Sequence, residues 1–348
     1  MPINGDLPKS KKGDHDFSMD DHRQIRLGII GLGKLWETRH RPALERMRDR
    51  FRVVTVYDQV LERARRTATQ MRCRHTESLA SLVEPNTIDA ICLLAPQWFG
   101  TYPVKLAASA KLPVYCSIPI VQIKDAEKIQ NLVTHQGLRF LPEMARRHYP
   151  ATRRLKELIA TRLGPVRMIL GQTRVADFDR YGQPGPGSQN APVSLKEDPI
   201  YYLLDWARHV VGEDPVSIIQ AESAIAPQPD SASSDCDFHT MILRFPNGAV
   251  AQMTCYRHQQ SVWGDANRVP PGPGYQIFSE RGMAFLEMPD LIRWNDSTGY
   301  HEERLPMSPS LGEILNDQFH ELVQGLNPQC PTIEDVMAAA RMLSRTDS

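Results

Sequence analysis

The first half of the chain alternates short apolar runs with segments of helical length, and this alternation limits the fold more than any other feature. Parallel strands need long crossover connections, so strands that alternate with helices indicate a parallel sheet. Nearly continuous apolar runs are typical of strands that are covered on both faces. We expect strands at 25–30, 51–57, 88–94, 114–117 and 138–141, and helices at 35–47, 61–71, 102–110 and 125–135. The sequence therefore predicts an α/β domain that ends near Pro142.

The second half predicts an α+β domain with a mainly antiparallel sheet. Asn247-Gly248 lies between two strand-like runs and is a strong hairpin signal. Residues 176–198 are rich in Gly, Pro and Asp and read as a long loop. We expect strands at 166–172, 216–221, 238–245, 249–256, 275–279 and 283–286, and helices at 151–162, 201–211, 311–326 and 332–343.

The length of 348 residues fits two lobes better than one core. We divide the chain into a leader at 1–24, a dinucleotide-binding Rossmann domain at 25–142, and a substrate and oligomerisation domain at 143–348. The leader is polar, charged and aperiodic, and it lacks the apolar stretch of a secretory signal. We therefore expect it to be disordered.

The bulk composition argues against several classes of partner. Forty-one basic residues balance 41 acidic ones, which gives no electrostatic case for nucleic acid or an anionic membrane. No apolar run approaches the roughly 20 residues of a membrane helix. The six cysteines include no C-x-x-C pair, and Cys92 and Cys116 lie in strand-like runs. We expect buried, reduced thiols and a cytoplasmic protein.

Gly31-Leu32-Gly33 follows the first strand and opens a helix, as in a dinucleotide-binding turn. The first glycine permits the bend, and the second lets the backbone approach a diphosphate. The free N–H groups at the start of the helix, at Lys34 and Leu35, are expected to face that diphosphate. The motif's third position calls for a small residue, and here it is Trp36. The alternative is a Rossmann-like fold that no longer holds a nucleotide.

Asp58 stands at the end of the second strand, where a carboxylate hydrogen-bonds the adenosine ribose of NAD. The same carboxylate would repel the additional phosphate of NADP. The next residue, Gln59, is not a basic side chain that would bind that phosphate. If a cofactor binds, NAD is therefore favoured over NADP.

The run GIIGLGKLWETRHRPAL resembles the opening of the glucose–fructose oxidoreductase, inositol dehydrogenase and MocA (Gfo/Idh/MocA) family. LLDWARHVVG is similar to that family's D-x-G-x-H helix, and the resemblance extends from about residue 24 to 345. It implies NAD(P)-dependent oxidation of a sugar, cyclitol or related polyol. It also implies a homo-oligomer packed through an open-faced sheet, with Pro96 and Ser117 beside the cofactor.

The chain departs from the family at the expected catalytic positions. The family carries Glu-Lys-Pro after the fifth strand, with the lysine near the reacting hydroxyl; here the residues are Ser117, Ile118 and Pro119. Isoleucine can neither donate nor accept a proton. Gly100 occupies a place where many relatives have a histidine.

Asp205 and His209 remain, and their i, i+4 spacing places both on one helix face. Histidine is the natural acid or base near neutral pH, and a neighbouring carboxylate can orient its ring and raise its pKa. The phenol of Tyr202 is a candidate replacement for the missing proton relay. The alternatives are a structural Asp–His pair, a tyrosine that only packs, and a metal site, for which we find no third ligand.

Three other groups lie near the expected cleft. Glu143 is expected to be a solvated or salt-bridged acid at the interdomain crossover. Of Arg146 and Arg147, one is expected to pair with an acid of the domain, and either is suited to an acidic substrate. The aromatic pair at 98–99 can stack on a ring of the ligand or pack locally.

The sequence is compatible with three functions. The first is an NAD-dependent oxidoreductase that uses His209, Asp205 and a tyrosine. The second is a catalytically impaired relative that binds a sugar, a nucleotide or a protein partner without turnover. The third is a lyase-like or hydrolytic use of NAD on a glycoside.

Overall fold

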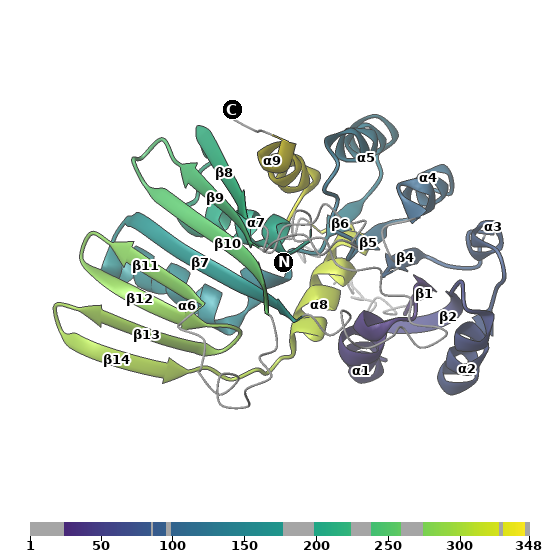
Figure 1. Cartoon of the computed structure of the whole chain (residues 1–348). Helices are drawn as coiled ribbons and strands as arrows, with labels where there is room; N and C mark the ends of the chain where they lie inside the picture. Colours follow the sequence, from purple (N-terminus) through teal and green to yellow (C-terminus); the bar gives the residue numbers. More distant parts are fainter. Residues whose placement is uncertain are drawn as a thin grey trace, which may run out of the picture.

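The computed structural model describes residues 24–84, 86–94, 99–176, 198–223, 238–258, 274–326 and 330–344. These residues form two β-sheets with their helices, lying side by side (Figure 1). Nearly all of the expected leader and of the expected loop at 176–198 lie outside the described residues, as do Pro96 and Trp98.

The N-terminal sheet is parallel throughout, which confirms the predicted Rossmann-like architecture. Its strand order is β3-β2-β1-β4-β5-β6, and each neighbouring pair runs parallel. The strands are β1 (Ile25–Ile30), β2 (Phe51–Tyr57), β3 (Arg74–His75), β4 (Ala90–Leu93), β5 (Val114–Cys116) and β6 (Phe140–Pro142). The helices are η1 (Trp36–His40), α1 (Arg41–Arg46), α2 (Leu61–Met71), α3 (Leu79–Leu82), α4 (Tyr102–Ser109) and α5 (Ile123–Gln136). The short elements β3 and α3 were not predicted.

The C-terminal sheet has the order β14-β13-β12-β11-β7-β10-β9-β8 and is mainly antiparallel, as predicted. Its one parallel pair joins β7 and β10. The strands are β7 (Val166–Ala176), β8 (Ser217–Ser223), β9 (Phe238–Arg244), β10 (Val250–His258), β11 (Tyr275–Ser279), β12 (Gly282–Glu287), β13 (Leu291–Asp296) and β14 (Gly299–Arg304). The predicted hairpin at Asn247-Gly248 is confirmed, because β9 and β10 pair antiparallel and Gly248 has a φ of 83°.

Helices cover one face of this sheet (Figure 1). They are α6 (Pro150–Leu158) and α7 (Asp198–Val211), which follow the short helical segment η3 (Ala145–His148). Along β10, Ala251, Met253 and Cys255 are buried, whereas Gln252 between them is exposed. This period of two is that of a sheet with one face packed and one face open.

The last two helices pack on helices of the N-terminal domain, and the second of them also packs on the C-terminal domain. Helix α8 (Leu311–Val323) packs on α1 and η1, and α9 (Ile333–Ser344) packs on α5 and α7. Leu315 and Phe319 of α8 belong to a core cluster of the N-terminal domain. Between them, α8 and α9 therefore contact helices of both lobes.

Two further sequence expectations concern burial and membranes. Cys92 and Cys116 are buried thiols, as predicted, and burial raises the pKa of Cys116 to about 12. Within the described ranges, no helix combines the length and the apolar character needed to cross a bilayer.

Candidate functional site

The carboxyl ends of β1, β2 and β5 bring Gly31, Asp58 and Ser117 to one edge of the parallel sheet. The strand order changes direction between β1 and β4, and ligands of open α/β sheets bind at such a point. Gly31 has a φ of 93°, which favours glycine, and its N–H donates to the Tyr57 carbonyl at 2.9 Å. A Cβ added to Gly33 would meet nothing within 4 Å. The loop therefore leaves open space where a diphosphate would approach the backbone.

The bulky Trp36 lies within the protein core. Its side chain is fully buried in a cluster that includes Leu27, Ile29 and Phe319. The helix turn that it opens is a π turn, closed by a bond from the Arg41 N–H to the Trp36 carbonyl. A π turn is wider than an α turn, and such turns are frequent at functional sites. The indole is thus accommodated beneath the helix, and the residues of the loop fit a dinucleotide.

Asp58 is buried and hydrogen-bonded to the glycine loop. Its Oδ2 accepts from the Leu32 N–H at 2.8 Å, and its Oδ1 accepts from the Val60 N–H at 2.8 Å. The Nη1 of Arg63 lies 3.3 Å from Oδ2. Sequence reasoning missed Arg63, although it is a basic residue in the first turn of the predicted helix α2. Its guanidinium offsets part of the negative charge at the ribose position.

The turn after β5 is held against β4 and is approached by α7. The backbone N–H of Ser117 donates to the Leu93 carbonyl at 3.0 Å, and its hydroxyl donates to the same oxygen at 3.2 Å. The Tyr202 hydroxyl donates to the Ser117 carbonyl at 3.4 Å. The predicted candidate Tyr202 therefore reaches the turn that, by family resemblance, would carry the catalytic lysine.

Ile118 lines a mostly apolar hollow of ≈ 170 Å³ at the carboxyl ends of β4 and β5, and Gly100 lines the same hollow. The two departures from the family pattern, Ile118 and Gly100, thus line one hollow. Phe99 packs edge-on to Tyr57, with ring centroids 6.1 Å apart.

Asp205 pairs with an arginine, not with His209. Its Oδ2 accepts from Arg147 Nε at 2.9 Å, and the Arg147 Nη2 also bonds Asp205 and lies 2.9 Å from Asp335. The expectation that one arginine of the pair 146–147 binds a domain acid is confirmed for Arg147. The expectation that the Asp205 carboxylate orients the His209 ring is wrong, because a buried carboxylate is better satisfied by a bidentate guanidinium.

The pKa of His209 is lowered, to about 3, and not raised as expected. Burial is the main cause, and the charges of Arg147 and Lys156 add to it. The Lys156 ammonium donates to the His209 carbonyl at 2.9 Å, which places that charge at the end of α7. The imidazole is therefore neutral at pH 7 and is a weaker base than an ordinary histidine.

Glu143 is salt-bridged and buried, which matches one of its two expected states. Arg39 donates to its carboxylate, as does the Tyr115 hydroxyl at 2.7 Å. Arg146, in the same crossover, donates to the Tyr275 hydroxyl.

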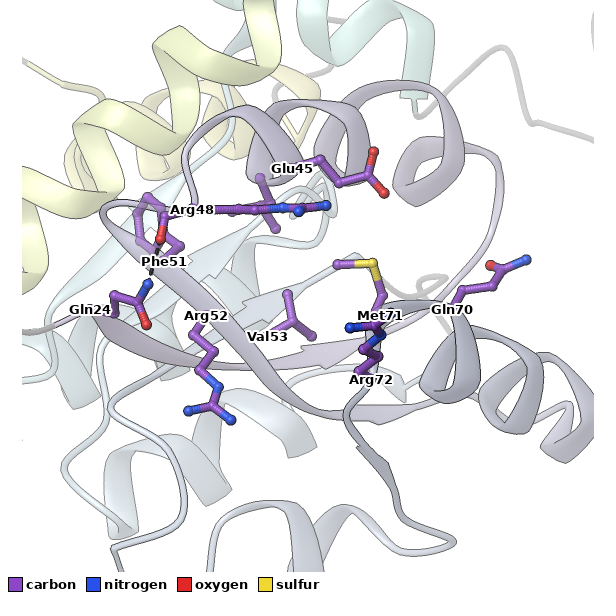
Figure 2. A pocket seen from close by; sticks show the side chains of 10 residues that line it. Gln24, Glu45, Arg48, Phe51, Arg52, Val53, Gln70, Met71 and Arg72 are labelled. Carbon is purple, nitrogen blue, oxygen red and sulfur yellow. Dashed lines mark hydrogen bonds between the residues drawn. The ribbon is translucent and has the colours of Figure 1, made fainter.

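A larger hollow of ≈ 570 Å³ lies elsewhere on the N-terminal domain (Figure 2). It is lined by the start of β2 and by the ends of α1 and α2, including Phe51, Arg48 and Arg72. This is the amino end of the strands, opposite the edge where α/β sheets bind their ligands. Among the described residues, no group of three His, Cys, Asp or Glu side chains is arranged to hold a metal ion.

Residues 25–144 match the model of an oxidoreductase family with an NAD-binding Rossmann fold. Over this domain, the chain is therefore similar to the Gfo/Idh/MocA oxidoreductases. A myo-inositol 2-dehydrogenase from Thermotoga maritima is 21% identical over 76% of this chain and 75% of its own length.

Two solved structures share the fold of this chain over most of its length. An oxidoreductase from Thermotoga maritima has a TM-score of 0.77 at 20% identity, over 92% of this chain and 95% of that one. A levoglucosan dehydrogenase in complex with NADH and levoglucosan has a TM-score of 0.75 at 17% identity, over 92% and 96%. At identities this low, the similarity shows a shared fold only.

Proposed function

We propose that this chain is an NAD-dependent oxidoreductase of the Gfo/Idh/MocA type that oxidises a secondary alcohol of a sugar, a cyclitol or a related polyol. The observation that carries the proposal is the open Gly31–Gly33 loop with the Asp58 carboxylate bound to its backbone. The names of the relatives, a myo-inositol dehydrogenase and a levoglucosan dehydrogenase, support the substrate class.

The cofactor would supply a hydride acceptor, and the protein would hold and orient it. The N–H groups at Lys34 and Leu35 would face the diphosphate, since they begin the helix after the loop. Asp58 would accept from the ribose hydroxyls, and Ser117 would border the nicotinamide half at the end of β5.

We assign the proton transfer to Tyr202 and His209. The Tyr202 phenol can take the proton of the substrate hydroxyl while it passes its own proton onward. His209 is neutral at pH 7 and can hold that proton only transiently, because burial lowers the pKa of its imidazole to about 3. Arg147 cannot act as a base, because pairing with two carboxylates raises its pKa further. Asp205 would then fix α7 by holding Arg147, and would not transfer a proton itself.

We also propose that NAD is preferred over NADP. The Asp58 carboxylate repels a phosphate on the ribose, and it is held in place by the N–H groups of Leu32 in the loop and of Val60 just before α2. Arg63 reduces the discrimination, since its guanidinium lies beside that carboxylate. Parallel titrations with NADH and NADPH should give the lower Kd for NADH.

The second candidate is a relative that binds its ligand without turnover. The observation that favours it is Ile118, which places an apolar side chain in a hollow where the reaction needs a proton-transfer group. Turnover of a polyol on the order of 1 per second or faster would exclude this candidate.

A polyol panel with NAD, followed by tyrosine variants on the best substrate, tests the proposed function. Tyr202→Phe should lower kcat by roughly 10²- to 10⁴-fold, because it removes a proton-transfer group, and should leave the Kd for NADH unchanged. Tyr201→Phe is the matched control, since Tyr201 is the neighbouring, fully packed ring. Equal rates for both variants would remove Tyr202 from the mechanism.

We propose that the open face of the C-terminal sheet joins copies of this chain. Met168 and Phe238 are exposed apolar residues of that sheet, at 37% and 41%. Apolar side chains on an uncovered sheet face favour association with a second apolar face.

A further inference from the structure

A buried ionic cluster joins the first helix of the N-terminal domain to the interdomain crossover. Glu143 directly follows β6, and its side chain is 4% exposed. Its carboxylate accepts from Arg39 and, at 2.7 Å, from the Tyr115 hydroxyl, and it lies 3.5 Å from the His40 Nε2. The His40 and Tyr115 rings meet edge to face with centroids 5.2 Å apart. Arg39 and His40 are the last two residues of η1.

This cluster resists displacement because a buried carboxylate is stable only while it is paired. Burial raises the pKa of Glu143, but His40 and Arg39 more than offset this, so the net pKa lies below its ordinary value. The carboxylate is therefore ionised at neutral pH. A movement of η1 away from β5 and β6 would leave that charge without its partners.

The position of η1 determines the geometry of the nucleotide loop. η1 begins at Trp36, three residues after Gly33, and the N–H groups before it are those that would face a diphosphate. In the usual motif a small residue at the place of Trp36 lets the helix press directly on the strand. Here the indole stands between them, so the helix lacks that contact. The Glu143 cluster holds the opposite end of the same π turn.

The crossover that carries Glu143 also contacts the substrate side of the site. The Glu143 N–H donates to the Cys116 carbonyl at 2.8 Å, next to Ser117. Four residues further along, Arg147 binds Asp205 of α7. One short segment thus touches the nucleotide helix, the turn after β5 and the helix that carries the catalytic candidates.

We propose that Glu143 is a positioning residue for the cofactor: its carboxylate, through Arg39 and His40, fixes η1 so that the loop presents its N–H groups to the diphosphate. This inference rests on the proposed nucleotide-binding function. It assigns to Glu143 no contact with the cofactor and no part in proton transfer.

The test compares Glu143→Gln with Asp89→Asn. Both substitutions remove the charge of a carboxylate that binds an arginine, but Asp89 pairs with Arg26 at the amino end of the sheet. Glu143→Gln should raise the Kd for NADH, measured by fluorescence, about tenfold or more. It should raise the KM for NAD while changing kcat little. Asp89→Asn should leave both constants near those of the wild type.

A second readout does not depend on activity. Hydrogen exchange of the backbone amides at residues 34–37 should become faster in Glu143→Gln and should stay unchanged in Asp89→Asn. Tyr115→Phe keeps the buried ring and removes one donor, so it should shift both readouts in the same direction by less. It provides the test if Glu143→Gln does not fold.

A folded Glu143→Gln or Tyr115→Phe protein with wild-type NADH affinity and wild-type exchange at residues 34–37 would overturn the inference. If the wild type binds no NADH at all, the proposed function fails instead. In that case, hydrogen exchange still tests the positioning role. Unchanged exchange at residues 34–37 in Glu143→Gln would show that Glu143 does not fix the loop, and faster exchange would show that it does.

Discussion

At the scale of single residues, the two main departures from the family pattern have different structural consequences. The Trp36 side chain is buried in the core and its backbone begins a π turn, while the space beside Gly33 stays open. Ile118 leaves no proton-transfer group at its own position, but Tyr202 reaches the same turn from α7. The residues of the proposed nucleotide half therefore fit the family pattern better than those of the proposed catalytic half.

The lowered pKa of His209 predicts a pH dependence of stability. The ordinary histidine pKa is about 6.5 and the folded value is about 3, so between these values the unfolded chain binds a proton that the folded chain does not. The free energy of unfolding should therefore fall as the pH drops through this window, by up to ~1.4 kcal/mol per pH unit.

His209→Gln should make that dependence shallower, which urea unfolding between pH 7 and pH 4 would measure. His135→Gln is the control, because His135 is exposed on α5. An unchanged slope in His209→Gln would contradict the assigned burial of a neutral ring.

At the scale of elements, sequence patterns predicted those with a strong period or a continuous apolar run. The ranges expected for β2 and α2 agree with the structure at both ends. The hairpin β13–β14 was missed, because charged residues such as Arg293 and Glu302 interrupt its apolar pattern. That Asp205 is the acid bound by Arg147 was not predicted, because the two residues are 58 positions apart, beyond any local period.

The packing of α8 on the first helix depends on Gly312. A Cβ there would lie 2.5 Å from the Arg39 carbonyl oxygen and 2.9 Å from the Ala43 Cβ. Gly312→Ala should lower the free energy of unfolding by about 1–3 kcal/mol, because this backbone contact outweighs the gain in helix propensity. Chemical denaturation measures the change, with Glu321→Ala on the same helix as the control. A stabilised Gly312→Ala protein would show that α8 does not pack this closely.

At the scale of the whole molecule, the open sheet face is the surface expected to join subunits. Light scattering after gel filtration should give a mass above that of one chain for the wild type. Met168→Lys, in the central strand β7, should shift the protein toward the monomer, because it places a charge in the apolar contact.

Leu326→Lys is the matched control, since Leu326 is 60% exposed and lies after α8, outside this sheet. It should leave the mass unchanged. A monomeric wild type, or equal effects of the two lysines, would exclude this face as the interface.

The most direct test of the whole account is a fluorescence titration of the wild-type protein with NADH. An intact glycine loop with Asp58 beside it predicts saturable binding with a Kd below 1 mM, weakened by Asp58→Asn. A protein that shows no binding at millimolar NADH would contradict the account, and the sequence and fold would then describe a Rossmann domain without its nucleotide.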